Sequence, residues 1–249
     1  MTAKLKSELY ELKLLFRNLP PVTFAVFVIS VITMNLLANK SISLPFDWLA
    51  LDCGIIVSWI SFLSMDVITK HFGPKAATEV SIAAVFLNLL CCLFFFLASH
   101  IPGMWGESYV EGSEAILNGA LDRTFGGAWY VIFGSTTAFI ASAFVNNFLN
   151  HMVGRLFREN PDGFFAYACR TYISTAAGQF ADNLIFALIV SHFFFGWTMT
   201  QCVMCALTGM IAELLCEALF SRLGYAMCVR WRHDNVGAQY LDYIKEKRK

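Results

Sequence analysis

The chain has 249 residues, and its 18 basic residues are balanced by 18 acidic ones. Hydrophobic residues make up 57% of it and the mean hydropathy is +0.59. Charged residues make up only 14%, against about a quarter in soluble globular domains, which argues against a water-soluble protein. We therefore expect a single membrane domain with little chain left for a soluble one.

Six stretches of the chain are apolar and long enough to cross the hydrocarbon core as helices of about 20 residues. In chain order they are residues 22–38, 48–69, 76–99, 128–149, 169–195 and 198–219. Residues 1–21, before the first span, are charged and amphipathic, and no small-residue cleavage site follows, so we expect no cleavable signal peptide. The sequence predicts an all-α integral membrane protein with about six transmembrane helices in one domain, 1–249.

The connections between the predicted spans have the composition of helix ends. Gly73-Pro74 separates the second span from the third, and Asn160-Pro161-Asp162-Gly163 separates the fourth from the fifth. Residues 100–127 form the one long connection, for which we expect a partly ordered loop at the membrane interface. A lid over a binding site is the alternative for this segment.

The basic residues lie almost entirely on one side of this topology. Of the 18 Lys and Arg residues, only Lys40 and Arg123 fall on the other side. By the positive-inside rule, this distribution predicts a multi-pass protein with both termini in the cytoplasm. Since topology accounts for the basic clusters, we expect the lipid bilayer and no nucleic acid among the partners.

Small residues recur every four positions in two of the spans. They are Gly134, Ala138 and Ser142 in the fourth span, and Ser174 and Gly178 in the fifth. Such strips allow helix backbones to approach each other closely in a membrane. We therefore expect tight helix contacts along both strips.

Cys202 and Cys205 have the C-x-x-C spacing of metal ligands. A structural zinc site needs four ligands, and neither a second pair nor a neighbouring His completes one here. Cysteines inside apolar helices behave as small polarizable residues. We expect structural thiols and no metal site.

Ionisable residues inside the predicted spans are the strongest functional signal. A charged side chain at the bilayer centre costs roughly 2.5 to 3.5 kcal/mol on insertion scales. At least four such residues occur here, among them Asp66, Asp182, Glu213 and Glu217. They indicate either a cavity that holds a polar ligand or couples protons, or polar groups that only hold helices together.

Glu213 and Glu217 are one helical turn apart, so two negative charges would repel each other. At least one of them should be protonated or paired with a cation. The candidate cations are Lys70 and Arg170, both close to predicted helix ends.

Gln179 and Asp182 are three residues apart and can face one cavity, with Asn183 on its flank. A carboxylate accepts two parallel hydrogen bonds, while a carboxamide both donates and accepts. This group suits a planar heterocycle with adjacent N–H donors, such as a guanine-like edge. Aromatic residues that could stack on such a ring are Trp59, Phe180 and Phe186.

Common enzyme motifs are absent from the sequence. It contains no G-x-S-x-G, no H-E-x-x-H and no phosphate-binding glycine loop. We expect a protein without catalytic residues or a cofactor. A membrane-embedded enzyme stays as an alternative.

Three strings carry a resemblance to a known family. They are L-A-N-K at 37–40, F-L-S-M-D-V at 62–67 followed by Phe72-Gly73, and R-T-Y-I-S-T-A-A-G-Q-F-A-D-N at 170–183. With the number and order of spans, these strings resemble the queuosine precursor transporter family, also called the vitamin uptake transporter (VUT) family. The third string is the most specific.

The resemblance implies a bacterial inner-membrane protein that takes up 7-deazaguanine precursors of queuosine or a related vitamin-like solute. It also implies a fold similar to the substrate-binding components of energy-coupling-factor transporters. Such a component would need a separate ATP-driven energising partner, and a homo-oligomer is a further alternative. The site residues that carry over from the family are Asp66, Arg170, Gln179 and Asp182.

In the family pattern an acidic residue is common at the position of Lys70 and a Lys at that of Glu213. The two are therefore swapped in charge here, and we hypothesise that they interact. A subgroup of the family with another ligand is the alternative that this swap leaves open. Together, the residues and the resemblance predict a substrate site. Its members are Asn39, Asp66, Arg170, Gln179, Asp182, Asn183, Glu213 and Glu217.

Overall fold

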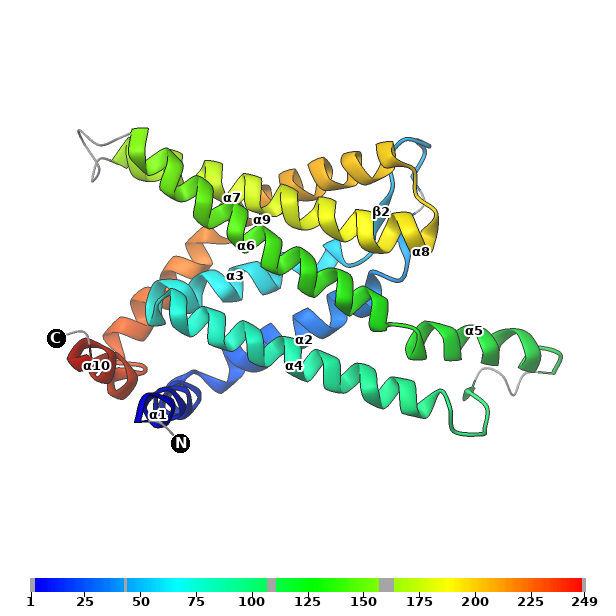
Figure 1. The fold of residues 1–249 in the computed structure, drawn as a ribbon, viewed down its shortest axis with the longest axis horizontal. Coiled ribbons are helices and arrows are strands. Elements are labelled where there is room, and N and C mark those ends of the chain that lie inside the picture. Colours follow the sequence, from blue (N-terminus) through cyan, green and yellow to red (C-terminus); the bar gives the residue numbers. More distant parts are fainter. Residues whose placement is uncertain (1–2, 43, 107–110, 157–163, 248–249) are drawn as a thin grey trace. The chain divides into compact units, whose positions relative to one another are not determined.

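The computed structural model describes residues 3–42, 44–106, 111–156 and 164–247, and most of them are helical (Figure 1). The elements in chain order are α1 (Ala3–Asn18), α2 (Pro21–Leu37), β1 (Ser41–Ile42), β2 (Leu51–Asp52), α3 (Ile55–Phe72), α4 (Pro74–Ala98), α5 (Glu114–Gly126), α6 (Trp129–Leu156), α7 (Phe164–Phe186), the π-helix η2 (Ala187–His192), α8 (Phe193–Phe195), α9 (Met199–His233) and α10 (Ala238–Lys247).

The predicted all-α membrane fold is confirmed. Within the described residues, four helices are long and apolar enough to cross a membrane: α3, α4, residues 172–195 and the first 22 residues of α9. A fifth span is counted if the bent pair of α1 and α2 is taken as one. Each predicted span overlaps a helix of the structure, while the count of six stays a prediction.

The second predicted span begins later than expected. Residues 48–54 are not helical, because the chain here forms the antiparallel pair of β1 and β2, with Ser41 opposite Asp52. The Asp52 carboxylate accepts a hydrogen bond of 2.8 Å from the backbone N–H of Gly54, just before α3. Gly54 also lies so close to α2 that a Cβ would be 2.7 Å from the carbonyl oxygen of Met34. The tight turn therefore moves the start of the helix to Ile55.

The long connection at 100–127 is not a plain loop, because it contains helix α5. Trp105, before this helix, folds back onto it. Its backbone N–H donates to Asn118 Oδ1 at 3.0 Å, its indole N–H donates to Asp122 Oδ1 at 2.8 Å, and its ring stacks on Phe125. These contacts order part of the connection, as expected, although the sequence did not predict the helix within it.

Helix α9 continues to His233, well past the predicted end of the last span. Cys228 and Trp231 in the added turns are buried, which explains why the helix is stable there. Asn235 and Gly237 then adopt positive φ angles of 52° and 73° and turn the chain into α10.

The chain divides into two compact units, and α2, α3, α4 and α9 each have residues in both. The first unit comprises Met1–Ile32, Val57–Asn88 and Glu217–Lys249. Its buried core includes Leu15, Phe27, Val67, Val80 and Tyr240. Helix α10 packs on α1, and the rings of Tyr243 and Tyr10 meet edge to face at 5.3 Å. The two terminal helices therefore share one core.

The second unit comprises Thr33–Ile56 and Leu89–Cys216. Helices α6 and α7 pack closely along their predicted small-residue strips, where Ala138, Ser174 and Gly178 are buried. A Cβ at Gly134 would collide with the side chain of Val190 in η2. The close approach predicted from the small residues is therefore confirmed.

Candidate functional site

The second unit holds a polar cluster between α7 and α9, inside otherwise apolar helices. Asn183 on α7 donates a hydrogen bond of 3.2 Å from its Nδ2 to Oε2 of Glu213 on α9. The Glu213 side chain is only 6% exposed. Gln179, one turn before Asn183, is also buried. Two of the eight predicted site residues, from distant parts of the sequence, are thus in direct contact.

Gly209, one turn before Glu213 on α9, provides the space for this contact. A Cβ at Gly209 would lie 2.9 Å from Nδ2 and 3.1 Å from Cγ of Asn183. Any larger side chain would therefore push the Asn183 carboxamide away. The glycine lets the α9 backbone come directly against the polar face of α7.

Asp182, beside Asn183 on α7, lies near the hydroxyl of Ser142 on α6, which donates a hydrogen bond of 3.0 Å to the carbonyl of Phe139. Ser142 is the last member of the small-residue strip of α6, so the strip that lets the two helices approach also brings a hydroxyl to this carboxyl group. Asp182 therefore neighbours α6, while Asn183 is hydrogen-bonded to α9.

Gln179 contributes a buried acceptor that the described part of the protein does not use. Its side chain is 7% exposed, and its Oε1 accepts no hydrogen bond from any residue that the structure describes. A buried carbonyl oxygen without a donor costs about 1 to 3 kcal/mol. This oxygen is therefore available to a donor on a bound molecule.

Asn39, after α2, has a different environment in the same unit. Its Oδ1 accepts a hydrogen bond of 2.9 Å from the hydroxyl of Tyr130, and its Nδ2 donates to the carbonyl of Leu36 at 3.1 Å. Both ends of this carboxamide therefore already have protein partners.

Asp66 belongs to the first unit, where Lys70 Nζ lies 3.3 Å from its Oδ2. Both side chains are substantially exposed in the structure. In the same unit, the ring of Trp59 stacks on Phe220 at 4.2 Å, so this candidate stacking residue has a protein partner. Whether Asp66 joins the polar cluster of α7 and α9 stays a prediction.

The structure does not describe the side chains of two predicted site residues. Arg170 is on α7 and Glu217 is on α9, and their backbones are helical. Their roles, and the interaction proposed between Lys70 and Glu213, stay predictions.

A family model described as "Putative vitamin uptake transporter" matches residues 52–227. The chain belongs to this family. The resemblance drawn from the sequence is thereby confirmed at the level of the vitamin uptake transporters. No curated protein and no solved structure matches the chain.

The family match covers the α7 and α9 cluster of this transporter completely, from Gln179 to Glu213. It leaves out α1 and α10, the two terminal helices. Helix α2, β1 and the predicted site residue Asn39 also lie outside the matched region.

Sequence reasoning missed two features of this site. Gly209 appeared only as one of 16 glycines, although a glycine one turn from a buried acid is a usable signal for a close backbone approach. The π-helix η2 begins four residues after Asn183, and such segments are frequent at functional sites. Its last residue, His192, is 2.6 Å from the carbonyl oxygen of Trp197.

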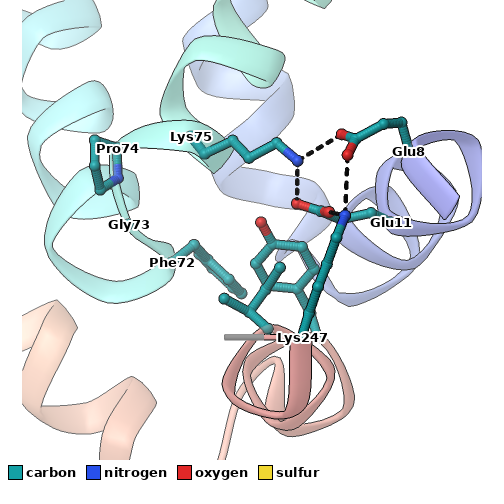
Figure 2. A pocket seen from close by; sticks show the side chains of 9 residues that line it. Glu8, Glu11, Phe72, Gly73, Pro74, Lys75 and Lys247 are labelled. Atoms are coloured by element: carbon teal, nitrogen blue, oxygen red, sulfur yellow. Dashed lines mark hydrogen bonds and ion pairs between the residues drawn. The ribbon is translucent and has the colours of Figure 1, made fainter. Parts of the chain in front are cut away.

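The first unit has a separate pocket of about 310 Å³, shown in Figure 2. Its apolar wall includes Phe72, Tyr240 and Ile244, and Lys75 and Lys247 lie on its polar side. None of the predicted site residues lines it. It is therefore distinct from the polar cluster of α7 and α9.

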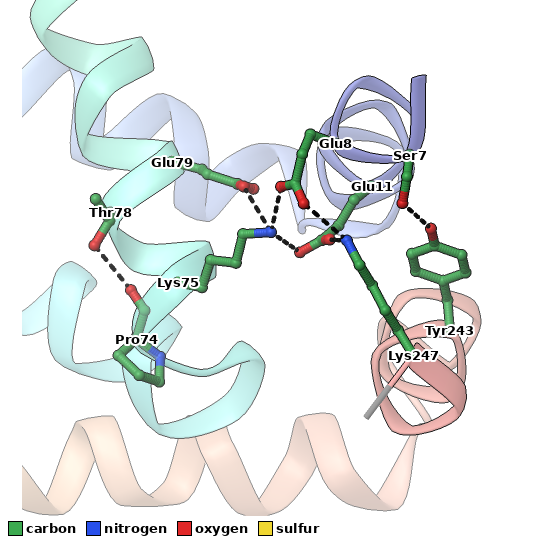
Figure 3. Close-up of polar contacts among 9 residues, drawn as sticks. All are labelled: Ser7, Glu8, Glu11, Pro74, Lys75, Thr78, Glu79, Tyr243 and Lys247. Atoms are coloured by element: carbon green, nitrogen blue, oxygen red, sulfur yellow. Dashed lines mark hydrogen bonds and ion pairs between the residues drawn. The ribbon is translucent and has the colours of Figure 1, made fainter. Parts of the chain in front are cut away.

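Three carboxylates beside this pocket lie within 4.8 Å of one another, on Glu8, Glu11 and Glu79. Lys75 Nζ lies among them, 2.6 Å from oxygens of Glu8 and Glu11 and 3.8 Å from Glu79 (Figure 3). An ammonium group thus occupies the position that a metal ion would take. These residues fit an ion-pair network and not a metal site.

Proposed function

We propose that this vitamin uptake transporter carries a small polar heterocyclic solute across the bacterial inner membrane, with a 7-deazaguanine precursor of queuosine as the preferred substrate. The observation that carries the proposal is the buried Oε1 of Gln179, for which the described residues supply no donor. Buried polar groups inside membrane helices are expensive, and they typically mark a substrate or ion pathway.

The neighbours of Gln179 narrow the chemistry of the solute. Asp182 and Glu213 offer carboxyl oxygens, and the carboxamides of Gln179 and Asn183 both donate and accept. A guanine-like ring presents adjacent N–H donors and a carbonyl acceptor along its edge. The cluster therefore suits such an edge better than an aliphatic or purely anionic solute.

Contacts within the first unit support the predicted topology. Helix α1, the start of α4 and α10 meet through Glu8, Lys75 and Lys247 (Figure 3). If α4 spans the bilayer, these contacts put both terminal helices on one side of it. The positive-inside rule makes that side the cytoplasm.

Uptake by the purified chain in liposomes tests the proposal directly. A thermal-shift panel of deazapurines, purines and vitamins first identifies the ligand, because a molecule that binds only the folded protein raises its melting temperature. We expect the largest shift with a 7-deazaguanine. If no deazaguanine shifts the melting temperature while another compound does, the substrate assignment is wrong.

The variant Gln179→Met keeps the side-chain volume and removes the hydrogen-bonding groups. We expect it to weaken solute binding about tenfold, as for one lost hydrogen bond of about 1.4 kcal/mol. Gln201→Met is the matched control, because Gln201 in the same unit hydrogen-bonds to Thr198 and to the carbonyl of Asp47. Equal losses in both variants would contradict a special role for Gln179.

Two alternatives are separated by the same preparation. Accumulation in liposomes without ATP indicates a transporter that works alone, whereas binding without accumulation indicates a component that needs an energising partner. Chemical conversion of the solute in detergent would instead indicate a membrane-embedded enzyme.

A further inference from the structure

Helix α1 has two sides of very different character. One side is directed into the first unit, where Glu11 and Leu15 are fully buried. Figure 3 shows Glu8 and Glu11 directed from α1 toward Lys75 and Lys247. The acidic side of α1 is therefore engaged with the rest of the protein.

The other side of α1 is apolar and solvent-accessible in the structure. Leu5 and Leu9, one turn apart, are 48% and 47% exposed. Leu12 and Phe16 continue the same stripe at a spacing of three and four residues, and both are half-buried. The residues that the structure describes leave about half of each of these two side chains uncovered.

A row of basic residues runs beside this apolar stripe. Lys6, Lys13 and Arg17 are all exposed. At about 100° per residue, the row lies roughly 80° around the helix from the stripe. An apolar face flanked by Lys and Arg is the pattern of helices that lie in the interface of a membrane with anionic lipids.

The direction of α1 agrees with such a position. Its axis is bent by 99° from that of α2, across the break at Asn18–Pro21. Pro20 and Pro21 favour this break, because the residue before a proline avoids the helical conformation. Helices that span a membrane tilt by only about 20° from the bilayer normal. If α2 spans the membrane, as the sequence predicts, a helix nearly perpendicular to it runs along the membrane plane.

We propose that α1 lies on an anionic phospholipid surface, on the side of the membrane that holds the two terminal helices. Leu5 and Leu9 enter the boundary of the acyl chains, and Lys6, Lys13 and Arg17 contact lipid phosphates. Helix α10 and Lys75 hold α1 in place through Glu8 and Glu11. This inference does not depend on the transported solute, and α1 lies outside the family match.

Photocrosslinking on the full chain tests the apolar stripe. The chain is reconstituted in liposomes of phosphatidylcholine with phosphatidylglycerol, with p-benzoylphenylalanine in place of Leu9. We expect lipid adducts at this position, as at Phe86, an exposed residue of the apolar helix α4 that serves as the positive control. Lys245, an exposed residue of α10, is the negative control.

The triple variant Lys6→Gln, Lys13→Gln and Arg17→Gln then tests the basic row. Each cation near an anionic surface changes the affinity about fivefold, so we expect the lipid adducts at position 9 to decrease by about fivefold or more. We expect the same decrease in lipid adducts for the protein with its native Lys6, Lys13 and Arg17 in liposomes of pure phosphatidylcholine. The matched control variant, Arg230→Gln, Arg232→Gln and Lys245→Gln, removes the same number of charges elsewhere.

Three outcomes would overturn the proposal. The first is an absence of lipid adducts at position 9 while Phe86 gives them. The second is crosslinking of position 9 to another copy of the chain instead of to lipid. The third is an adduct yield that is the same with and without phosphatidylglycerol, or that decreases equally in the two triple variants.

Discussion

Lys247 Nζ in α10 lies 2.6 Å from Oε2 of Glu11 in α1, a residue 236 positions earlier in the sequence. The other carboxylate oxygen of Glu11 is 2.6 Å from Lys75 Nζ, so one buried carboxylate joins both terminal helices to the start of α4. Figure 3 shows the two ammonium groups meeting it from two helices. The two terminal helices are therefore joined by ion pairs as well as by apolar contacts.

Replacing Glu11 by Gln should destabilise the first unit. The variant keeps the shape of the side chain but leaves two ammonium groups without their buried partner. We expect a loss of about 2 kcal/mol, as for a charged hydrogen bond, and a melting temperature lower by roughly 5 °C. Thermal unfolding in detergent measures this change.

Glu8→Gln is the matched control, because Glu8 contacts the same two lysines from the same helix but its side chain is 41% exposed. We expect a smaller decrease in melting temperature than for Glu11→Gln, since exposed ion pairs are screened by water. A larger decrease would mean that burial does not determine the strength of this network.

The contact between α1 and α10 should depend on pH at both extremes. Hydrogen bonds from Lys75 and Lys247 lower the pKa of Glu8 from 4.5 to about 2. Burial alone would raise the pKa of Glu11, but hydrogen bonds from Lys247 and Lys75 outweigh it and the pKa is lowered. The hydrogen bonds that Lys247 donates, chiefly to Glu11, raise the pKa of Lys247 above 10.5.

The sign of each shift fixes the expected pH profile. A carboxylate with a lowered pKa stabilises the folded state above its unfolded value of 4.5, and this contribution is lost as the pH falls toward 2. A lysine with a raised pKa contributes below 10.5 and the contribution is lost above that pH. Energy transfer between dyes on the two chain ends should be constant from about pH 5 to 10 and decrease outside this range. A decrease centred near pH 7 would contradict the assignment of these groups.

Gly209→Ala should disrupt the polar cluster without disturbing the membrane fold. The new methyl group would lie 2.9 Å from Asn183 Nδ2 and displace its hydrogen bond to Glu213. We expect the dissociation constant of the transported solute to rise about tenfold, the effect of one lost hydrogen bond. Binding measured by thermal shift checks this expectation.

Gly119→Ala is the control for that experiment. Gly119 is also helical, in α5, and a Cβ there would meet nothing within 4 Å. Since alanine is a better helix former than glycine, the control should bind the solute normally. If both alanine variants bind the solute normally, the space that Gly209 leaves for Asn183 is not needed for solute binding.

Tyr130→Phe separates a structural role of Asn39 from a binding role. The variant removes the hydrogen bond of 2.9 Å to Asn39 Oδ1, which should cost about 1 kcal/mol of stability. Because both ends of Asn39 have protein partners, we expect a lower melting temperature and an unchanged affinity for the solute. A changed affinity would instead support Asn39 as a substrate-binding residue.

The positions of the helices could be predicted from the sequence because hydropathy acts locally. Stretches such as residues 89–98 are apolar over their whole length, and in lipid such a stretch satisfies its backbone hydrogen bonds only as a helix. Gln179, Asp182 and Asn183 could be grouped for a similar reason, since their spacing along one helix is enough to place them on neighbouring faces. The late start of α3 and the presence of α5 were missed, because the pairing of β1 with β2 and the contacts of Trp105 join residues from different segments.

The sequence by itself thus determined that this chain lies in a membrane, in what order its helices follow, and which polar residues lie inside them. Each of these properties depends on residues within about one helical turn or one span. The tertiary structure alone decided which of those residues meet. Glu213 faces Asn183 because Gly209 leaves room for it, and Glu11 is paired with Lys247 from the opposite end of the chain. Contacts of this kind depend on how helices pack. The local periodicity of a sequence does not show which residue of another helix will be in contact.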